Sequence, residues 1–203
     1  HVRGYECHSA LAHQGVNAVE AAAELVAQLK AMARRKRDAG PFDRDYAPPY
    51  TTIHTGVIRG GTALNIVPKD CRFDFEFRLL PEEDADALMR EVRAFAEERL
   101  LPEMRAVRPE AAISFADLTA FPGLDTAADA EVTRLAAALT GTTATGKVSF
   151  GTEGGLFQEA GIPTIVCGPG SIEEAHKPDE FIDLDQIARC EAFMRRLFAR
   201  LAA

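Results

Sequence analysis

The sequence predicts a mixed α/β protein whose first part has the element order β-α-β-β-α-β. Strict alternation of apolar and charged residues over 71–79 is typical of a strand with one face on a core and the other in water. Apolar residues recur at helical spacing from Val16 to Leu29, and the helix that they predict ends in a basic run before Gly40. Together these patterns indicate a ferredoxin-like arrangement over residues 1–118.

The other elements of this first part come from shorter signals. Residues 1–6 alternate and predict the first strand, and the β-branched run 51–58 predicts the second. Proline and acidic residues at 81–84 are typical of a first helical turn, and apolar residues continue on one face after it. Residues 112–116 predict the last strand.

The pattern changes after residue 118. Helices are predicted at 129–139 and from Thr152, and short strands at 143–149 and 164–167. A final amphipathic helix carries the apolar residues Ile187, Cys190, Phe193, Met194, Leu197 and Leu201. Alternating helices and short apolar strands are typical of a parallel sheet covered by helices. Two short strands are too few for an independent α/β domain. We therefore expect this sheet to continue in residues that precede His1.

Composition and charge argue against several classes of protein. Apolar residues make up 47% of the 203 residues and charged residues 27%, which is typical of a soluble globular protein. The net charge of −8 argues against nucleic acid and anionic membranes as partners, because both need a basic surface. The four cysteines show no C-x-x-C spacing, so we expect reduced thiols and a cytoplasmic protein.

One histidine lies where ligands usually bind in an α/β fold. His176 is part of the Gly/Pro loop 168–181, which leaves the carboxyl end of the predicted strand 164–167. A lone histidine does not specify a metal site, because catalytic zinc needs three protein ligands or a dinuclear equivalent. From spacing alone, a metal ligand and a solvent-exposed loop residue are equal alternatives.

Three further positions are weak candidates when they are taken alone. The turn Gly151-Thr152-Glu153 follows a predicted strand and opens a predicted helix, so its free backbone N–H groups suit an anion or an oxyanion. Arg78 ends the alternating strand, and Asn65 follows a glycine pair. Their residue types alone favour a solvated strand residue and a turn residue.

Several strings match the motifs of one enzyme family in order and spacing. The string GPGSIEEAHKPDEF at 168–181, the segment TGVIRGGTALNIVP at 55–68 and the pair CHSA…GVNA at 7–18 resemble motifs of the acetylornithine deacetylase / succinyl-diaminopimelate desuccinylase family. Cys7 replaces the usual glycine. The resemblance covers essentially the whole chain. It implies a ferredoxin-like lid and dimerisation domain over 1–118, followed by the C-terminal segment of an α/β zinc-peptidase-like catalytic domain over 119–203.

The resemblance also implies a role for each residue of the lid motifs. The family uses two zinc ions, with cobalt as an alternative, and His176 would bind one of them. His8 would reach from the lid of one subunit into the active site of the other and polarise the scissile carbonyl, so a homodimer is expected. Asn65 and Arg78 would hold the substrate carboxylate, which a planar guanidinium pairs through both oxygens.

The turn before the predicted helix that begins at Thr152 would contact the rest of the substrate. The pair Thr152-Glu153 resembles acetylornithine deacetylases in particular, and Gly151 would stabilise the oxyanion. Glu153 would then pair with the side-chain ammonium of ornithine. The expected reaction is the deacetylation of N2-acetylornithine in arginine biosynthesis.

The family's other metal ligands and its glutamate general base lie before the lid. No comparable cluster occurs in these 203 residues, so we expect the chain by itself to be inactive. Three alternatives stay open at this point: a succinyl-diaminopimelate desuccinylase, an aminoacylase-like peptidase, and a non-catalytic module for dimerisation or for binding a small molecule.

Overall fold

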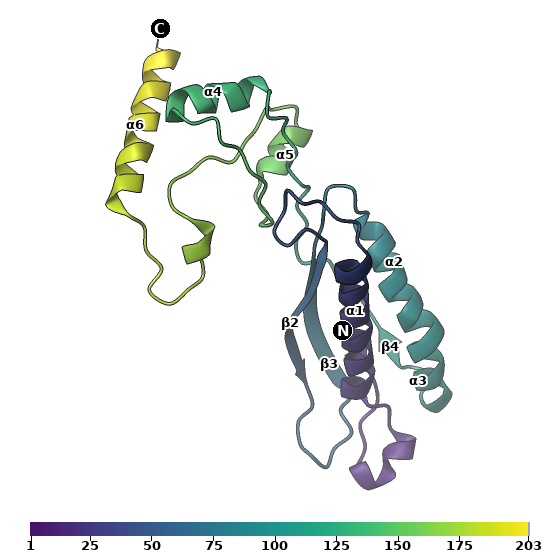
Figure 1. Cartoon of the computed structure of the whole chain (residues 1–203). Coiled ribbons are helices and arrows are strands. Elements are labelled where there is room, and N and C mark those ends of the chain that lie inside the picture. Colours follow the sequence, from purple (N-terminus) through teal and green to yellow (C-terminus); the bar gives the residue numbers. More distant parts are fainter. Residues whose placement is uncertain (203) are drawn as a thin grey trace. The chain divides into compact units, whose positions relative to one another are not determined.

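The chain forms two compact units (Figure 1). The structure is a computed structural model, and it describes residues 1–202. The first unit contains residues 1–120 together with 148–150, and the second contains the remaining described residues. We describe each unit by itself.

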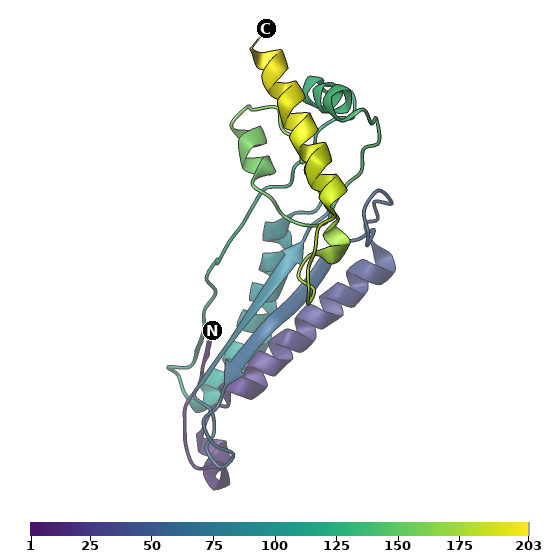
Figure 2. The ribbon, with the colours of Figure 1, turned by 90° about the vertical axis from the view of Figure 1, so that its left-hand side faces the viewer.

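The first unit is a four-stranded antiparallel sheet with one layer of helices on one side, in which the first helix and the later helical run lie side by side (Figures 1 and 2). The strand order is β2-β3-β1-β4, and every neighbouring pair is antiparallel. The elements follow the chain as β1 Val2–Arg3, α1 Ala18–Ala39, β2 Thr52–Gly60, β3 Asp70–Arg78, α2 Ala85–Phe95, η2 Ala96–Leu100, α3 Leu101–Val107 and β4 Ala112–Ile113. This arrangement confirms the predicted ferredoxin-like fold.

The inner strand β1 and the edge strand β4 are shorter than the sequence predicts. Each has two residues, where 1–6 and 112–116 were expected to be extended. The strand β1 ends before Gly4, where the chain crosses so close to Val16 that a Cβ atom would lie 2.0 Å from the carbonyl oxygen of Val16. Glycine is therefore required at this crossing, and Tyr5 forms only an isolated bridge with Val16.

Helix α1 supplies most of the core of the first unit. Asn17 starts it by accepting hydrogen bonds from the N–H groups of Val19 and Glu20, at 3.0 and 3.2 Å. The stripe Leu25, Leu29 and Met32 is at most 1% exposed and packs in one cluster with side chains of β3 and α2. Burying each such side chain contributes about 2 kcal/mol, so this stripe is the main reason that the unit folds.

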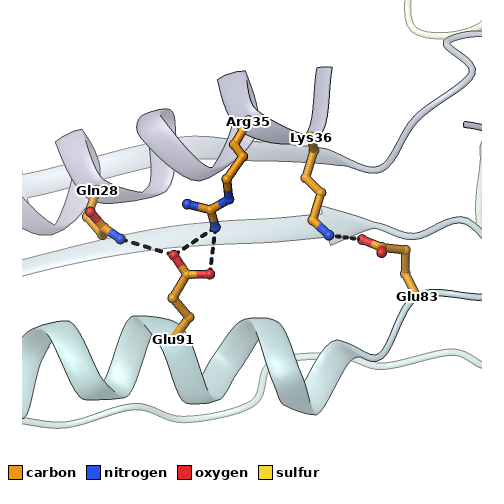
Figure 3. A network of polar contacts seen from close by, with 5 residues as sticks. All are labelled: Gln28, Arg35, Lys36, Glu83 and Glu91. Atoms are coloured by element: carbon orange, nitrogen blue, oxygen red, sulfur yellow. Dashed lines mark hydrogen bonds and ion pairs between the residues drawn. The ribbon is translucent and has the colours of Figure 1, made fainter. Parts of the chain in front are cut away.

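Polar contacts also join α1 to α2 and to the turn before it (Figure 3). Lys36 Nζ lies 2.6 Å from Glu83 Oε2, and these side chains are 16% and 10% exposed. Glu91 of α2 accepts two hydrogen bonds from Arg35, at 2.8 and 2.6 Å, and one from Gln28 at 3.3 Å. The basic end of α1 is therefore held by carboxylates of α2 and of the turn before it.

The second unit contains helices and loops. Its elements are α4 Glu131–Thr140, α5 Gly154–Glu159, η3 Ile172–Glu174 and α6 Leu184–Leu201. The strands predicted at 143–149 and 164–167 are wrong for the described residues, which form no strand there. An extended segment needs a neighbouring strand for its backbone N–H and C=O groups, and the described part of this unit offers none.

None of the helices in the described residues combines the length and the apolar character that a membrane span requires.

Candidate functional site

The structure brings two of the predicted residues together at one end of the β2–β3 hairpin. The N–H of Ser9 donates to the carbonyl oxygen of Asn65 at 3.0 Å, and the N–H of Val67 donates to the carbonyl oxygen of Cys7 at 2.8 Å. His8 forms an isolated antiparallel bridge with Ile66 between these two bonds. The segment that carries His8 thus lies directly beside the loop that carries Asn65.

The hydrogen bonds of His8 define what its ring can do. His8 precedes the short helix η1, Ser9–Gln14, and its Nδ1 accepts the N–H of Ala10 at 3.1 Å. A neutral imidazole with an accepting Nδ1 carries its proton on Nε2. The side chain is exposed, so this Nε2–H is available to donate a hydrogen bond to a carbonyl oxygen or an oxyanion.

Gly15 allows the His8 segment to fold tightly against the rest of the unit. A Cβ at Gly15 would lie 2.7 Å from Cys7 Sγ and 3.0 Å from a methyl carbon of Val67. Cys7 donates its thiol hydrogen to the carbonyl oxygen of Leu11 at 3.3 Å. The larger residue is thus accommodated within the loop.

Arg78 lies at the opposite end of the same hairpin. It is the last residue of β3 and pairs with Thr52, while the loop containing Asn65 precedes the first residue of β3. Nine strand residues span about 27 Å at the usual rise, so one chain does not bring Arg78 to Asn65 or His8. The guanidinium instead makes two hydrogen bonds to the carboxylate of Glu76, at 3.1 and 3.0 Å.

The predicted turn in the second unit opens helix α5. Thr152 Oγ1 accepts the N–H of Gly154 at 3.1 Å, and Glu153 is the exposed residue before the helix, with no side-chain hydrogen bond to the helix end. Gly155 packs closely, since a Cβ there would lie 2.1 Å from the carbonyl oxygen of Pro122. Gly151 is exposed at the start of this turn.

His176 lies on an exposed loop in an unusual backbone conformation. Its φ is 61°, in the left-handed region that non-glycine residues rarely adopt, and its N–H donates to Glu180 Oε2 at 3.0 Å. Asp179, with a φ of 60°, shares this conformation. Such geometry at a non-glycine residue indicates a constrained loop, which motivates a functional hypothesis for His176.

The residues present do not build a zinc site by themselves. Within residues 1–202, no group of three or more histidine, cysteine, aspartate or glutamate side chains is arranged to hold a metal ion. Catalytic zinc needs three protein ligands, so His176 would require partners from outside these residues.

Arg108 was not expected at the site, yet it contacts the segment that carries His8. The guanidinium carbon of Arg108 lies 3.8 Å from the centre of the Tyr5 ring, and its Nε donates to the carbonyl oxygen of Gln14 at 3.0 Å. The sequence carries no local signal for these contacts, because 94 positions separate Gln14 from Arg108.

The sequence of the first unit identifies the class of protein to which the chain belongs. Residues 1–104 match the M20 peptidase dimerisation domain, so the chain belongs to that family. Among its relatives are the acetylornithine deacetylases of Myxococcus xanthus, 34% identical over 98% of this chain and 50% of the relative, and of Proteus mirabilis, 32% identical over 97% and 49%. The chain thus spans about half the length of the curated relatives that it matches.

Solved structures share the fold at lower identity. A tripeptidase from Staphylococcus aureus superposes with a TM-score of 0.64 at 20% identity, over 95% of this chain and 48% of that one. The aminopeptidase PepT from Bacillus cereus gives a TM-score of 0.61 at 23% identity, over 95% and 48%. At these identities the likeness shows the fold alone.

Proposed function

We propose that the chain is the lid and C-terminal segment of a metal-dependent amidohydrolase that deacetylates N2-acetylornithine in a cytoplasmic route to arginine. The main observation is the His8–Asn65 pair at the hairpin end, where His8 offers a free Nε2–H. The identity to acetylornithine deacetylases supports the choice of substrate.

His8 donates a hydrogen bond to the carbonyl oxygen as the amide is attacked. Negative charge develops on that oxygen in the transition state, and one donor of this kind is worth about 10²–10³-fold in kcat. The bond from Ala10 to Nδ1 keeps the proton on the other ring nitrogen, Nε2. Gly151, on the second unit, is a further N–H donor in this proposal.

Two chains form each complete site. Arg78 and Asn65 both bind the substrate carboxylate in this proposal, yet β3 separates them by about 27 Å within one chain. A second copy removes this conflict by supplying His8 and Asn65 to the site that holds Arg78. Strand β2 lies at the edge of the sheet with most of its residues exposed, and an unpaired edge of nine residues is suited to pairing with another chain.

Zinc is part of the proposed enzyme, with His176 as the one ligand from this chain. The remaining ligands of a two-ion site, or of a cobalt form, lie outside these residues. A bound metal of this kind supplies an activated water by lowering its pKa. We therefore expect the 203 residues alone to be inactive.

The role of His8 is tested in the complete enzyme with N2-acetylornithine. His8→Ala lowers kcat about 10²–10³-fold, because the oxyanion loses one donor. His13→Ala is the matched control, since His13 is an exposed histidine on the short helix η1 that directly follows His8. Equal losses in both variants, or no loss in His8→Ala, would contradict the proposal.

The sharing of sites between chains is tested by mixing two inactive variants. His8→Ala and Arg78→Ala protomers are combined, dissociated and reassociated. If the residues act across the dimer, each mixed dimer has one intact site, and random pairing restores about one quarter of wild-type activity. If both residues act within one chain, the mixture stays inactive.

The substrate is tested through Glu153. Glu153→Gln raises KM for N2-acetylornithine and leaves KM for an N-acetyl amino acid with a neutral side chain unchanged, because the lost partner faces the ornithine ammonium. A panel that includes N-succinyl-diaminopimelate distinguishes a desuccinylase. An unchanged KM for acetylornithine would remove Glu153 from the substrate site.

A further inference from the structure

The loop that carries His8, residues 5–16, makes few contacts through its own side chains that would hold it in place. Helix η1 buries none of its residues, and Leu11 within it has non-helical angles, with φ −113° and ψ 27°. Leu11 is also 44% exposed. A segment without buried apolar contacts opens locally at low cost, so the position of His8 depends on the contacts at the margins of the loop.

Backbone hydrogen bonds hold the two ends of the loop and the part next to His8. Tyr5 and Val16 exchange two hydrogen bonds, at 2.9 and 3.0 Å, and so close the loop at its base. The bonds to the Asn65 loop hold the flank next to His8. Charged side chains also reach the loop from distant parts of the sequence: Lys69 pairs with Glu6 at 2.9 Å, and a second contact comes from the residue that follows α3.

This contact is Arg108, and it joins both ends of the loop. Its guanidinium stacks on the ring of Tyr5, where the loop begins, and its Nε–H reaches the carbonyl oxygen of Gln14, where η1 ends. Arg108 directly follows α3, which is fixed in the core of the unit by Leu101 and Met104. The loop is thereby connected to the rigid helical layer.

Only an arginine makes both contacts with one side chain. A planar guanidinium can stack on an aromatic face and still donate in its own plane, whereas an ammonium is a point charge without a planar fork. The half-buried position of Arg108 strengthens the stacking relative to a fully solvated pair.

We infer that Arg108 is a positioning residue that fixes the orientation of His8 by holding the two ends of its loop. The catalytic consequence rests on the proposed function, but the effect on the loop does not. Arg108 itself does not touch the substrate in this proposal, so it acts only through His8.

Amide hydrogen exchange on the 203-residue chain tests the effect on the loop. Arg108→Ala accelerates exchange of the Ser9 and Ala10 amides about tenfold, because these N–H groups bond to Asn65 and to His8. Exchange at Leu25 and Leu29, in the core of α1, stays unchanged. Arg108→Lys gives an intermediate rate, since lysine keeps one of the two contacts.

Arg99→Ala is the matched control. Arg99 is an exposed arginine of the adjacent helical segment η2, and within residues 1–202 the structure describes no hydrogen bond or ion pair for it. Unchanged exchange at Ser9 and Ala10 in Arg108→Ala would overturn the inference. So would an equal acceleration at Leu25 and Leu29, which would show a general loss of stability, or the same result in Arg99→Ala.

Kinetics of the complete enzyme separate the two proposals. Arg108→Ala lowers kcat about tenfold and leaves KM for N2-acetylornithine within about twofold, because small displacements of a catalytic group mainly affect the reacting step. If the exchange changes as expected and the wild-type enzyme does not cleave acetylornithine, the proposed function fails and the inference stands. If the enzyme is active and kcat does not change in Arg108→Ala, the inference fails.

Discussion

The two units of this chain differ in how their apolar side chains are used. In the first unit, Leu25, Leu29 and Met32 of α1 are buried in one cluster shared with the sheet and α2. In the second unit, α6 has an equally clear apolar stripe, yet none of its residues is buried and Leu184 is 81% exposed. Helical periodicity thus predicts a helix in both places. The apolar stripe stabilises the fold only where another element packs against it.

The largest expected effect compares one substitution in both units. Leu25→Ala lowers the free energy of unfolding by about 3 kcal/mol, because it leaves a cavity in the core. Leu184→Ala changes it by less than about 0.5 kcal/mol, since that side chain is already exposed. Urea unfolding of the 203-residue chain measures both. Similar losses would mean that α6 is packed in solution.

A second comparison concerns ion pairs. Lys36→Met lowers the free energy of unfolding by about 2 kcal/mol, because it leaves the carboxylate of Glu83 largely buried without a cation. Lys177→Met in the second unit removes a pair with Glu174 at 4.0 Å and costs less than about 0.5 kcal/mol. Adding Glu83→Leu to Lys36→Met recovers most of the loss. No recovery would show that the pair is not the cause.

Helix starts provide a third contrast. Asn17→Ala lowers the free energy of unfolding by about 1 kcal/mol, because two N–H groups of α1 lose their acceptor. Asp183→Ala at the start of α6 has a smaller effect, since no side-chain hydrogen bond is made there. Thermal unfolding followed by circular dichroism measures both variants. A larger effect of Asp183→Ala would reverse the contrast.

The smallest effect is a difference in thiol reactivity. Burial raises the pKa of the Cys71 thiol, so its thiolate fraction at pH 8 is below that of an ordinary cysteine. The sign for stability follows: a raised pKa in the folded state favours folding at low pH, and this contribution is lost as pH rises past the ordinary thiol value. With a thiol reagent at pH 8, exposed Cys167 reacts first and Cys71 last. Equal rates would place Cys71 at the surface.

The fold of the first unit was predictable because its signals are local. The alternation in β3 and the spacing in α1 each predict an element without reference to the rest of the chain. The strands predicted at 143–149 and 164–167 failed for the opposite reason. A short apolar run becomes a strand only when another strand lies beside it, and its own sequence does not contain that information.

The sequence predicted which residues belong to the candidate site, but not how they are arranged in space. The motifs gave His8 and Asn65, and the structure places them side by side. Sequence did not show that Arg78 lies at the far end of the hairpin, since this depends on the register of β2 and β3. Arg108 was missed altogether, because its contacts with Tyr5 and Gln14 arise from tertiary packing.

The pairing of β2 with β3 makes the first unit intolerant of small changes in length. Side chains alternate between the two faces of β3, so Arg78 shares the solvated face with Glu76, while Phe77 points to the helices. Deleting one residue inside β3 would make the guanidinium of Arg78 point toward the apolar side chains beneath the helices. Deleting two would restore its direction but shorten the hairpin by about 7 Å. The number of residues between the two ends of this strand therefore sets both the direction of Arg78 and its distance from the loop that carries Asn65.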